Sequence, residues 1–480
     1  MRKRGRSVRR NHTLFSNIIP ILTILCLCAL SSCECNDYGD IGKQQGSAEA
    51  ALTAKIISPS GNVTIIEGQS VNFEGSVDGG TEPFTYLWTF DGEAPDSDQK
   101  DAKNITFTTQ GTYIVTFIVR DGKDATDSAT ITMTVRSPGT VSAGMTHTLA
   151  IKPDGTLWAM GYNFNGELGD GTWVNKSIPV QVGSDKNWVG VGAGDAYSVA
   201  IKSDGTLWSW GYIYDDTLRL VVRKNAPVQL GADRDWVAVS TGWYHTLALK
   251  SNGTLWAWGD NTYGQLGEGT YEWRGTPVQV GTDKNWIAMS AGSWYSMALK
   301  SDGTLWSWGG NEACFWFWVI KKYTPVQVGT DKDWVAVSAG WAHALALKSD
   351  GTLWASGDNA YGQLGDTTWK RKDHLVQVNA ETDWVAVSAG VNHSLALKTD
   401  GSTWAWGDNY YGQLGDGTLD NKNSPVKVNS DISWVVVNSK SNSNIAVKSD
   451  GTFWTWGWNG DGQLGNGSTM KSNIPIKIGF

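Results

Sequence analysis

The sequence has little charge, few cysteines and an acidic charge balance. Charged residues make up 18% of the 480 positions, and 47 acidic side chains outnumber 39 basic ones, so the formal net charge is −8. Proteins that bind nucleic acid through phosphate contacts need a basic surface, so this function class is disfavoured. The five cysteines show neither a disulfide framework nor the paired spacing of a zinc site.

Catalytic motifs are also missing. The chain contains no G-x-S-x-G, no H-E-x-x-H and no phosphate-binding G-x-x-x-x-G-K-S/T. The carboxylates between positions 91 and 101 follow no metal-ligand spacing, so we interpret this stretch as a solvated loop. We therefore predict a protein that is not an enzyme and that uses no cofactor and no metal.

The N-terminus has the features of a targeting segment. Six basic residues precede an apolar run from Ile18 to Leu30, which is typical of a secretion signal. The following Leu-Ser-Ser-Cys resembles the lipobox of bacterial lipoproteins, and this resemblance implies lipidation at Cys33. An ordinary cleaved signal with an incidental cysteine is the alternative. We expect a signal peptide over 1–32, a flexible tether over 33–54, and a lipid-anchored protein of the cell envelope, at the outer membrane or cell surface.

Residues 55–137 predict a small β-sandwich. Short alternating segments rich in Val, Ile, Thr and aromatic residues are separated by turn residues at the spacing of such folds. The segments that begin at Tyr86 (YLWTFDG) and Gly111 (GTYIVTFIVRD) resemble the PKD family of Ig-like domains. We expect Trp88 to lie in the core of this domain.

Residues 138–480 consist of seven repeats of about 50 residues. A hairpin glycine recurs at spacings of 48 or 50, at positions 155, 205, 253, 303, 351, 401 and 451. Each repeat holds four short alternating runs, which predicts one four-stranded propeller blade. The recurring G-x-x-H, D-G-T-L-W and G-Q-L-G-x-G elements resemble the RCC1 family, which implies a seven-bladed β-propeller that holds a partner protein through residues on one face. The second and fourth repeats lack the Gly-Gln-Leu-Gly turn.

The ends of the repeat region carry a prediction about ring closure. A Trp-Val-x-Val run occurs six times, from Trp188 to Trp434, and residues 140–144 match its end. We expect this N-terminal segment to complete the last blade and so remove an exposed sheet edge.

One column of the repeat holds histidine in four blades, at positions 147, 245, 343 and 393, and tyrosine in blades two and four. A column shared by several blades indicates a structural role, and the same holds for the tryptophan column that begins at Trp158 and Trp208.

Positions that vary between blades are better candidates for function. Two such positions precede the histidine column in every repeat, and aromatic residues gather there in blades three to five. Large rings of this kind anchor protein interfaces. The alternative is that the rings fold inward and pack at the channel mouth. Our candidate binding residues, two of them from the histidine column itself, are Asp195, Tyr197, Trp243, Tyr244, Trp294, Tyr295, Trp341 and Asn392.

A second candidate is the apolar run over 313–320, which replaces the glycine-rich turn of blade four and is either an exposed contact or a repacked strand. We also expect partly exposed rings at Trp173, Trp273 and Trp369. Two rival functions stay open: carbohydrate binding through exposed tryptophans, and a hydrolase or lyase that uses carboxylates in the central channel. The partner expected first is a protein, with polysaccharide second and no nucleic acid.

Overall fold

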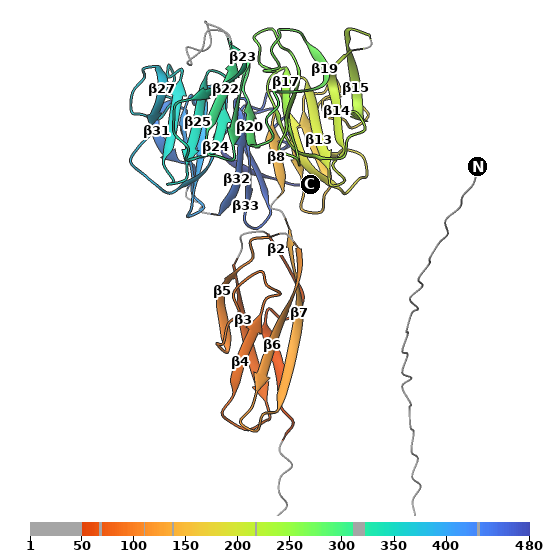
Figure 1. Ribbon diagram of the computed structural model, residues 1–480, viewed down its shortest axis with the longest axis vertical. Helices are drawn as coiled ribbons and strands as arrows, with labels where there is room; N and C mark the ends of the chain where they lie inside the picture. The colour runs from red at the N-terminus through yellow and green to blue at the C-terminus, as the bar shows by residue number, and fades with distance from the viewer. Residues whose placement is uncertain are drawn as a thin grey trace, which may run out of the picture. The chain divides into compact units, whose positions relative to one another are not determined.

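The structure is a computed structural model that describes residues 50–66, 70–109, 111–136, 139–216, 218–310, 322–429 and 433–480. All regular elements in these ranges are β-strands, which confirms the predicted all-β class (Figure 1). Cys33, the signal segment and the apolar run over 313–320 lie outside the described residues.

In the described ranges, no helix has the length and apolar character that a membrane span requires.

The N-terminal strands form two sheets that enclose an aromatic core. One sheet contains β1 (Thr53–Ser58), β3 (Ser70–Asp78) and β5 (Asp101–Thr106); the other contains β2 (Val63–Ile66), β7 (Thr126–Arg136), β6 (Gly111–Arg120) and β4 (Thr85–Thr89). Trp88 is fully buried against Phe117, with ring centroids 4.5 Å apart, and its indole N–H donates to the Lys100 carbonyl at 3.1 Å. The expected core role of Trp88 is confirmed. Strand β1 was not apparent from the sequence because its segment, TAKIIS, alternates weakly.

The remaining strands form seven four-stranded antiparallel sheets, one for each repeat. Blade one contains β8 (Thr140–Ala143), β9 (His147–Ile151), β10 (Leu157–Gly161) and β11 (Lys176–Gln181). Blade two contains β12 (Trp188–Ala193), β13 (Tyr197–Lys202), β14 (Leu207–Asp215) and β15 (Leu220–Gln229). Blade three contains β16 (Trp236–Thr241), β17 (His245–Lys250), β18 (Leu255–Gly259) and β19 (Arg274–Gln279).

The last four blades follow the same order along the chain. Blade four contains β20 (Trp286–Ala291), β21 (Tyr295–Lys300), β22 (Leu305–Gly309) and β23 (Lys322–Val328). Blade five contains β24 (Trp334–Ala339), β25 (His343–Lys348), β26 (Leu353–Gly357) and β27 (Lys372–Gln377). Blade six contains β28 (Trp384–Ala389), β29 (His393–Lys398), β30 (Thr403–Gly407) and β31 (Lys422–Lys427). Blade seven contains β32 (Trp434–Ser439), β33 (Ser443–Lys448), β34 (Phe453–Gly457) and β35 (Ser472–Ile478).

The repeated tryptophans hold a lysine in each blade. In blade four, Lys300 Nζ lies 4.7 Å from the Trp286 ring and 3.8 Å from the Trp306 ring, and it pairs with Asp283 at 2.8 Å. A cation over two aromatic faces is favourable, and the rings cover its aliphatic stem. The tryptophan column therefore has the structural role that its repetition predicts.

The predicted mode of ring closure is wrong. Strand β8 pairs with β9, so it is the inner strand of blade one, and blade seven is complete with β32 to β35. The link between β8 and β9 is too short for β8 to reach another sheet, because it is a tight turn over 144–146 in which Gly144 donates to the His147 carbonyl. Each blade therefore begins one strand earlier than the repeat pattern suggests, at the Trp-Val-x-Val strand. The ring closes by packing of β8 beside β32 and β33, and the Ala143 amide donates to Asn438 Oδ1 at 2.8 Å (Figure 1).

Candidate functional site

The varying positions lie at one end of every blade. Because neighbouring strands run in opposite directions, the loop between the first and second strands and the loop between the third and fourth strands lie at the same end of a sheet. A backbone hydrogen bond joins these two loops in most blades, for example from the Asp260 amide to the Tyr244 carbonyl at 2.8 Å. We call this end of the ring the loop face.

Three tryptophans from adjacent blades form one cluster on the loop face. The ring centroid of Trp243 lies 5.1 Å from that of Trp294 and 6.0 Å from that of Trp341. The rings of Trp243 and Trp341 are nearly parallel, with an interplanar angle of 10°. Trp294 and Trp341 are 6.4 Å apart. Each ring is partly buried and partly exposed. The tryptophan cluster (Trp243, Trp294 and Trp341) therefore combines the two alternatives that the sequence left open, since its rings pack on one another and still present a surface.

Tyr244 and Asp195 extend this surface toward blade two. Tyr244 is 40% exposed, and burial together with the nearby Asp195 carboxylate raises its pKa to about 12. Burial also raises the pKa of Asp195. Asn392 lies on the same face in blade six and is partly buried.

The varying loops of the loop face carry buried polar atoms without partners. Nineteen buried side-chain polar atoms have no hydrogen-bond partner in the described parts of the chain, and nine of these are on the repeated histidines and tryptophans. Four others belong to the varying pairs of blades four to seven: Ser293 Oγ, Trp341 Nε1, Asn392 Oδ1 and Asn442 Oδ1. Buried polar atoms are usually satisfied, and those that are not call for an explanation such as water or a ligand. These loops thus keep hydrogen-bonding capacity that the fold does not use.

Two candidates, Tyr197 and Tyr295, belong to the frame of the ring and not to the surface. They are 7% and 3% exposed, and their hydroxyls donate to the backbone carbonyls of His245 and His343 in the next blade, at 2.6 and 2.7 Å. A ring held in this way presents nothing to a partner. We correct the candidate set by removing both residues.

The histidine column joins neighbouring blades. The Nε2 atom of His147 lies 2.8 Å from Ser198 Oγ of blade two, and this hydroxyl donates to the Glu167 carbonyl of blade one at 2.7 Å. Since a serine has one hydroxyl hydrogen, the histidine must carry a proton on Nε2 and donate it to the serine oxygen. Burial lowers the pKa of His147, His245 and His343 to about 3 and that of His393 to about 4. This is the structural role expected for the column.

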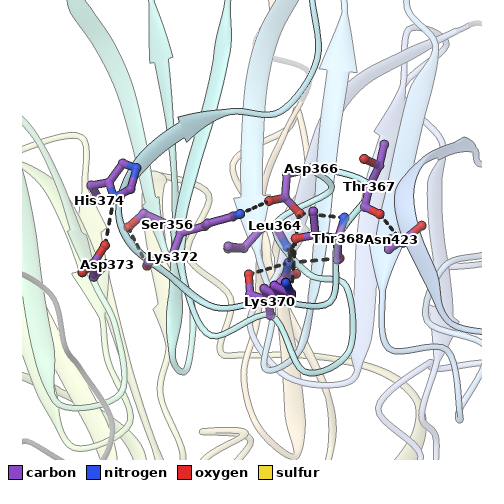
Figure 2. Close-up of polar contacts among 11 residues, drawn as sticks. Ser356, Leu364, Asp366, Thr367, Thr368, Lys370, Lys372, Asp373, His374 and Asn423 are labelled. Atoms are coloured by element: carbon purple, nitrogen blue, oxygen red, sulfur yellow. Dashed lines mark hydrogen bonds and ion pairs between the residues drawn. The ribbon is translucent and has the colours of Figure 1, made fainter.

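The glycine-rich turns form the other contact between blades. We call the turns at 166–169, 264–267, 362–365, 412–415 and 462–465 clasp turns. In four of the five turns, the carbonyl of the second residue accepts a hydrogen bond from a tryptophan of the next blade, as in Trp406 Nε1 to the Gln363 carbonyl at 2.9 Å. Figure 2 shows the blade-five turn, where Lys372 pairs with Asp366 at 3.2 Å and Asn423 of blade six donates to the Thr367 carbonyl at 2.7 Å.

The central channel contains a small cavity of about 110 Å³ lined by inner strands. Its described lining consists mainly of serines and small residues with one charged group, Lys440, whose pKa burial lowers to about 7. The rival hypothesis of a channel-sited hydrolase requires carboxylates, and the described lining contains none. No group of three His, Cys, Asp or Glu side chains in the described ranges is arranged to hold a metal ion.

One pocket was not apparent from the sequence. It has a volume of about 400 Å³, lies between blades two and three, and is lined by Tyr212, Tyr214, Tyr244, Trp258 and Trp273 among others. The signal in the sequence is the absence of a clasp turn in blade two, which leaves the neighbouring blade three without that contact. Trp173, Trp273 and Trp369 are 43%, 43% and 50% exposed, which confirms the expected partial exposure.

Comparison with known proteins agrees with this geometry. The RCC1-like domain family matches residues 219–479, which is more than half of the chain. The chain belongs to the RCC1-like domain family. In addition, the RCC1 repeat matches residues 154–201 and the PKD domain matches residues 54–135. A search of curated proteins gives no significant match.

Solved structures show the same RCC1-like propeller fold. Human WBSCR16 is 20% identical with a TM-score of 0.60, over 68% of this chain and 94% of its own. Yeast RCC1 (Prp20), solved bound to Kap60, is 20% identical with a TM-score of 0.59, and the match covers 67% of this chain and 83% of the yeast chain. Prp20p from Saccharomyces cerevisiae, solved separately, is 20% identical with a TM-score of 0.55, over 76% and 92%.

Proposed function

We propose that this RCC1-like propeller is a non-enzymatic binding platform for a protein partner. The binding surface consists of the tryptophan cluster, Tyr244, Asp195 and Asn392 on the loop face. The observation that carries the proposal is the coincidence of a partly exposed aromatic cluster with four polar atoms that have no partner among the described residues, on the loops that vary between blades. Protein interfaces use this combination of aromatic anchors and polar groups.

The fold relatives support a protein as the partner class. Yeast RCC1 was solved with Kap60, and Prp20p is described with its binding to Gsp1p and histones. The acidic charge of this chain agrees with a partner other than nucleic acid.

The test compares matched tryptophan variants of residues Ala50–Phe480, which form one compact unit. The triple variant Trp243→Ala, Trp294→Ala, Trp341→Ala removes the cluster, and the control Trp173→Ala, Trp369→Ala removes exposed rings elsewhere. We expect the parent and the control to capture the same protein from an envelope extract. The purified partner should bind the triple variant at least about 30-fold more weakly, because central aromatic anchors contribute about 2 kcal/mol or more.

The result that contradicts this proposal is equal affinity of the parent and the triple variant for the captured protein. Capture of glycans alone on a glycan array, with no protein, would favour the carbohydrate rival. Circular dichroism of each variant checks that the propeller stays folded.

We further propose that a lipid on Cys33 holds the chain at the cell envelope. The proposal rests on the Leu-Ser-Ser-Cys sequence after the apolar run. Several acyl chains give stable anchoring, because each buried CH₂ contributes about 0.8 kcal/mol. We expect Cys33→Ala to abolish incorporation of a labelled fatty acid and to release the protein from the membrane fraction. Unchanged labelling of the variant would rule out this anchor.

A further inference from the structure

The contact between blades two and three differs from the other contacts between blades. In four blades, the tryptophan of the third strand donates its indole N–H to the clasp turn of the preceding blade, at 2.8 to 3.0 Å. The donors are Trp210, Trp308, Trp406 and Trp456, and the acceptors are the carbonyls of Glu167, Gln265, Gln363 and Gln413. Trp258 holds the same position in blade three, but blade two has no clasp turn to meet it.

Trp258 has therefore lost its acceptor. The residue is only 6% exposed, and its Nε1 donates to no residue in the described part of the chain, while the indole lines the pocket between blades two and three. In a clasped contact a hydroxyl of the second strand also donates to the clasp carbonyl, as Ser198 does to Glu167. The residue at this position in blade three is Thr246, and its hydroxyl donates to the Tyr197 hydroxyl at 3.0 Å instead. The missing turn thus leaves the indole N–H of a largely buried tryptophan without a partner among the described residues.

A cation of blade two has lost its partner as well. In four blades with a clasp turn, the first residue of the fourth strand is basic and pairs with the acidic residue just after the turn. These pairs are Lys176 with Asp170, Arg274 with Glu268, Lys372 with Asp366 and Lys422 with Asp416, at 3.5, 3.3, 3.2 and 3.9 Å. Sheet register places Lys224 at this position in blade two, opposite Gly211. Lys224 is exposed, lines the same pocket, and forms no ion pair within the described ranges.

The space where the turn would lie is open. Strands β14 and β15 continue past the point at which the other blades turn, and the register of β14 with β15 extends to Asp215 and Leu220. This hairpin forms one wall of the 400 Å³ pocket through Tyr212, Ile213 and Val221, and Trp258 and Trp273 form part of the other. Tyr212 and Trp273 are 44% and 43% exposed, so rings are accessible at the rim.

We propose that this pocket binds a Leu-Gly turn of a partner protein that carries an acidic residue directly after the glycine. A main-chain carbonyl of the turn accepts from Trp258 Nε1, the carboxylate pairs with Lys224, and the leucine enters the aromatic pocket. The occupant is a peptide turn because the tryptophan and the basic residue at the positions of Trp258 and Lys224 contact a clasp turn in the clasped blades of this chain. The pocket shares Tyr244 with the surface proposed above but contains none of the three tryptophans of the cluster, so the proposal does not depend on the function proposed for that cluster.

The glycine of the occupant is a specific requirement. In the clasped blades the last glycine of the turn lies against the indole, and a Cβ atom built there would stand 2.5 Å from Trp308 Nε1 at Gly267 and 2.7 Å from Trp406 Nε1 at Gly365. Any side chain at this position would displace the ring. A turn with alanine in place of this glycine should therefore not bind.

The probe is a labelled, cyclised peptide with the sequence of residues 261–270, NTYGQLGEGT, titrated into Ala50–Phe480 by fluorescence anisotropy. We expect saturable binding that weakens about 3- to 10-fold in Trp258→Phe, as the loss of one hydrogen bond predicts. Lys224→Gln should weaken binding in low salt, and it should have no effect on a peptide with glutamine in place of the glutamate. Tyr212→Ala removes an exposed ring of the wall and should weaken binding without unfolding the blade.

Matched controls decide the outcome. Lys370→Gln and Tyr361→Ala change exposed side chains of the same types in blade five, and both should bind the peptide as the parent does. The triple variant of the tryptophan cluster should also bind it, which keeps this test independent of the proposed function. No binding by the parent at millimolar peptide, or equal binding by Trp258→Phe, Lys224→Gln and the controls, overturns the proposal.

Discussion

Replacing Trp406 by alanine is expected to lower the free energy of unfolding of the propeller by about 3–5 kcal/mol, the range for buried Trp-to-Ala changes. Trp406 is fully buried between blades five and six, packs on Trp384 at 6.3 Å, and donates to the Gln363 carbonyl. The substitution leaves a cavity and removes one of the two hydrogen bonds that the Gln363 carbonyl accepts at this contact between blades, since Ser394 Oγ still donates to it. The measurement is the urea dependence of tryptophan fluorescence.

Trp258 offers a matched control, because it has the same place in its blade without a clasp turn. Trp258→Ala should lower the free energy of unfolding by at least about 1 kcal/mol less than Trp406→Ala does, because no clasp hydrogen bond is broken. In addition, the cavity that it leaves joins a pocket that is already open. Equal losses at the two positions would show that the clasp bond contributes nothing to the contact between blades.

Acidification is expected to destabilise the propeller steeply between about pH 6.5 and pH 4.5. Burial lowers the pKa of four histidines from 6.5 to about 3 or 4, so the unfolded chain takes up protons that the folded chain does not. Stability is then complete above pH 6.5 and is lost as the pH falls, by about 1.4 kcal/mol per pH unit for each histidine. Carboxyl groups with raised pKa values oppose this trend: burial raises the pKa of Glu167 to about 7 and also raises the pKa of Asp195 and Asp461, so the folded chain binds these protons first. The four histidines and Glu167 together give a net slope of about 4 kcal/mol per pH unit.

Single substitutions separate the histidines from other acid effects. Blade seven carries Ser443 in the histidine column, so serine is compatible with the site. His245→Ser should reduce the slope by about 1.4 kcal/mol per pH unit, whereas His374→Ser, at an exposed position, should leave it unchanged. Urea midpoints between pH 7.5 and 4.5 give both slopes. A slope that His245→Ser does not alter would mean that this histidine is protonated in the folded state.

The repeat made most of the fold predictable. Seven hairpin glycines and four alternating runs per repeat determined the number of blades and of strands, because each run can bury its apolar face only in a sheet. The mode of closure was not predictable in the same way. The six tryptophan strands and the segment 140–144 can each be the first strand of one blade or the last strand of the blade before it, and the sequence repeat fits both divisions. Pairing of β8 with β9 decided between them.

The candidate site was predictable only in part. Variation between blades located Trp243, Trp294 and Trp341 on one face, but sequence spacing could not show that rings from blades three and five stack at 6.0 Å. Tyr197 and Tyr295 stand next to varying positions in the sequence, yet they point into the next blade and are buried. The side of a strand that a residue faces depends on the neighbouring blade, which the local sequence does not contain.

The sequence by itself determined the all-β class, the seven repeats and the structural role of the repeated histidines and tryptophans, because strand periodicity and turn glycines act over a few residues. Only the tertiary structure decided which groups meet across blades, namely the stacked rings of the tryptophan cluster and the buried tyrosines, and which donors, those of Trp258 and Lys224, have no partner in the described part of the chain. These contacts join residues about 30 or more positions apart, and their chemistry depends on which neighbour has lost its turn. A missing clasp turn can be seen in the sequence, but the pocket that it leaves exists only once the two blades are side by side.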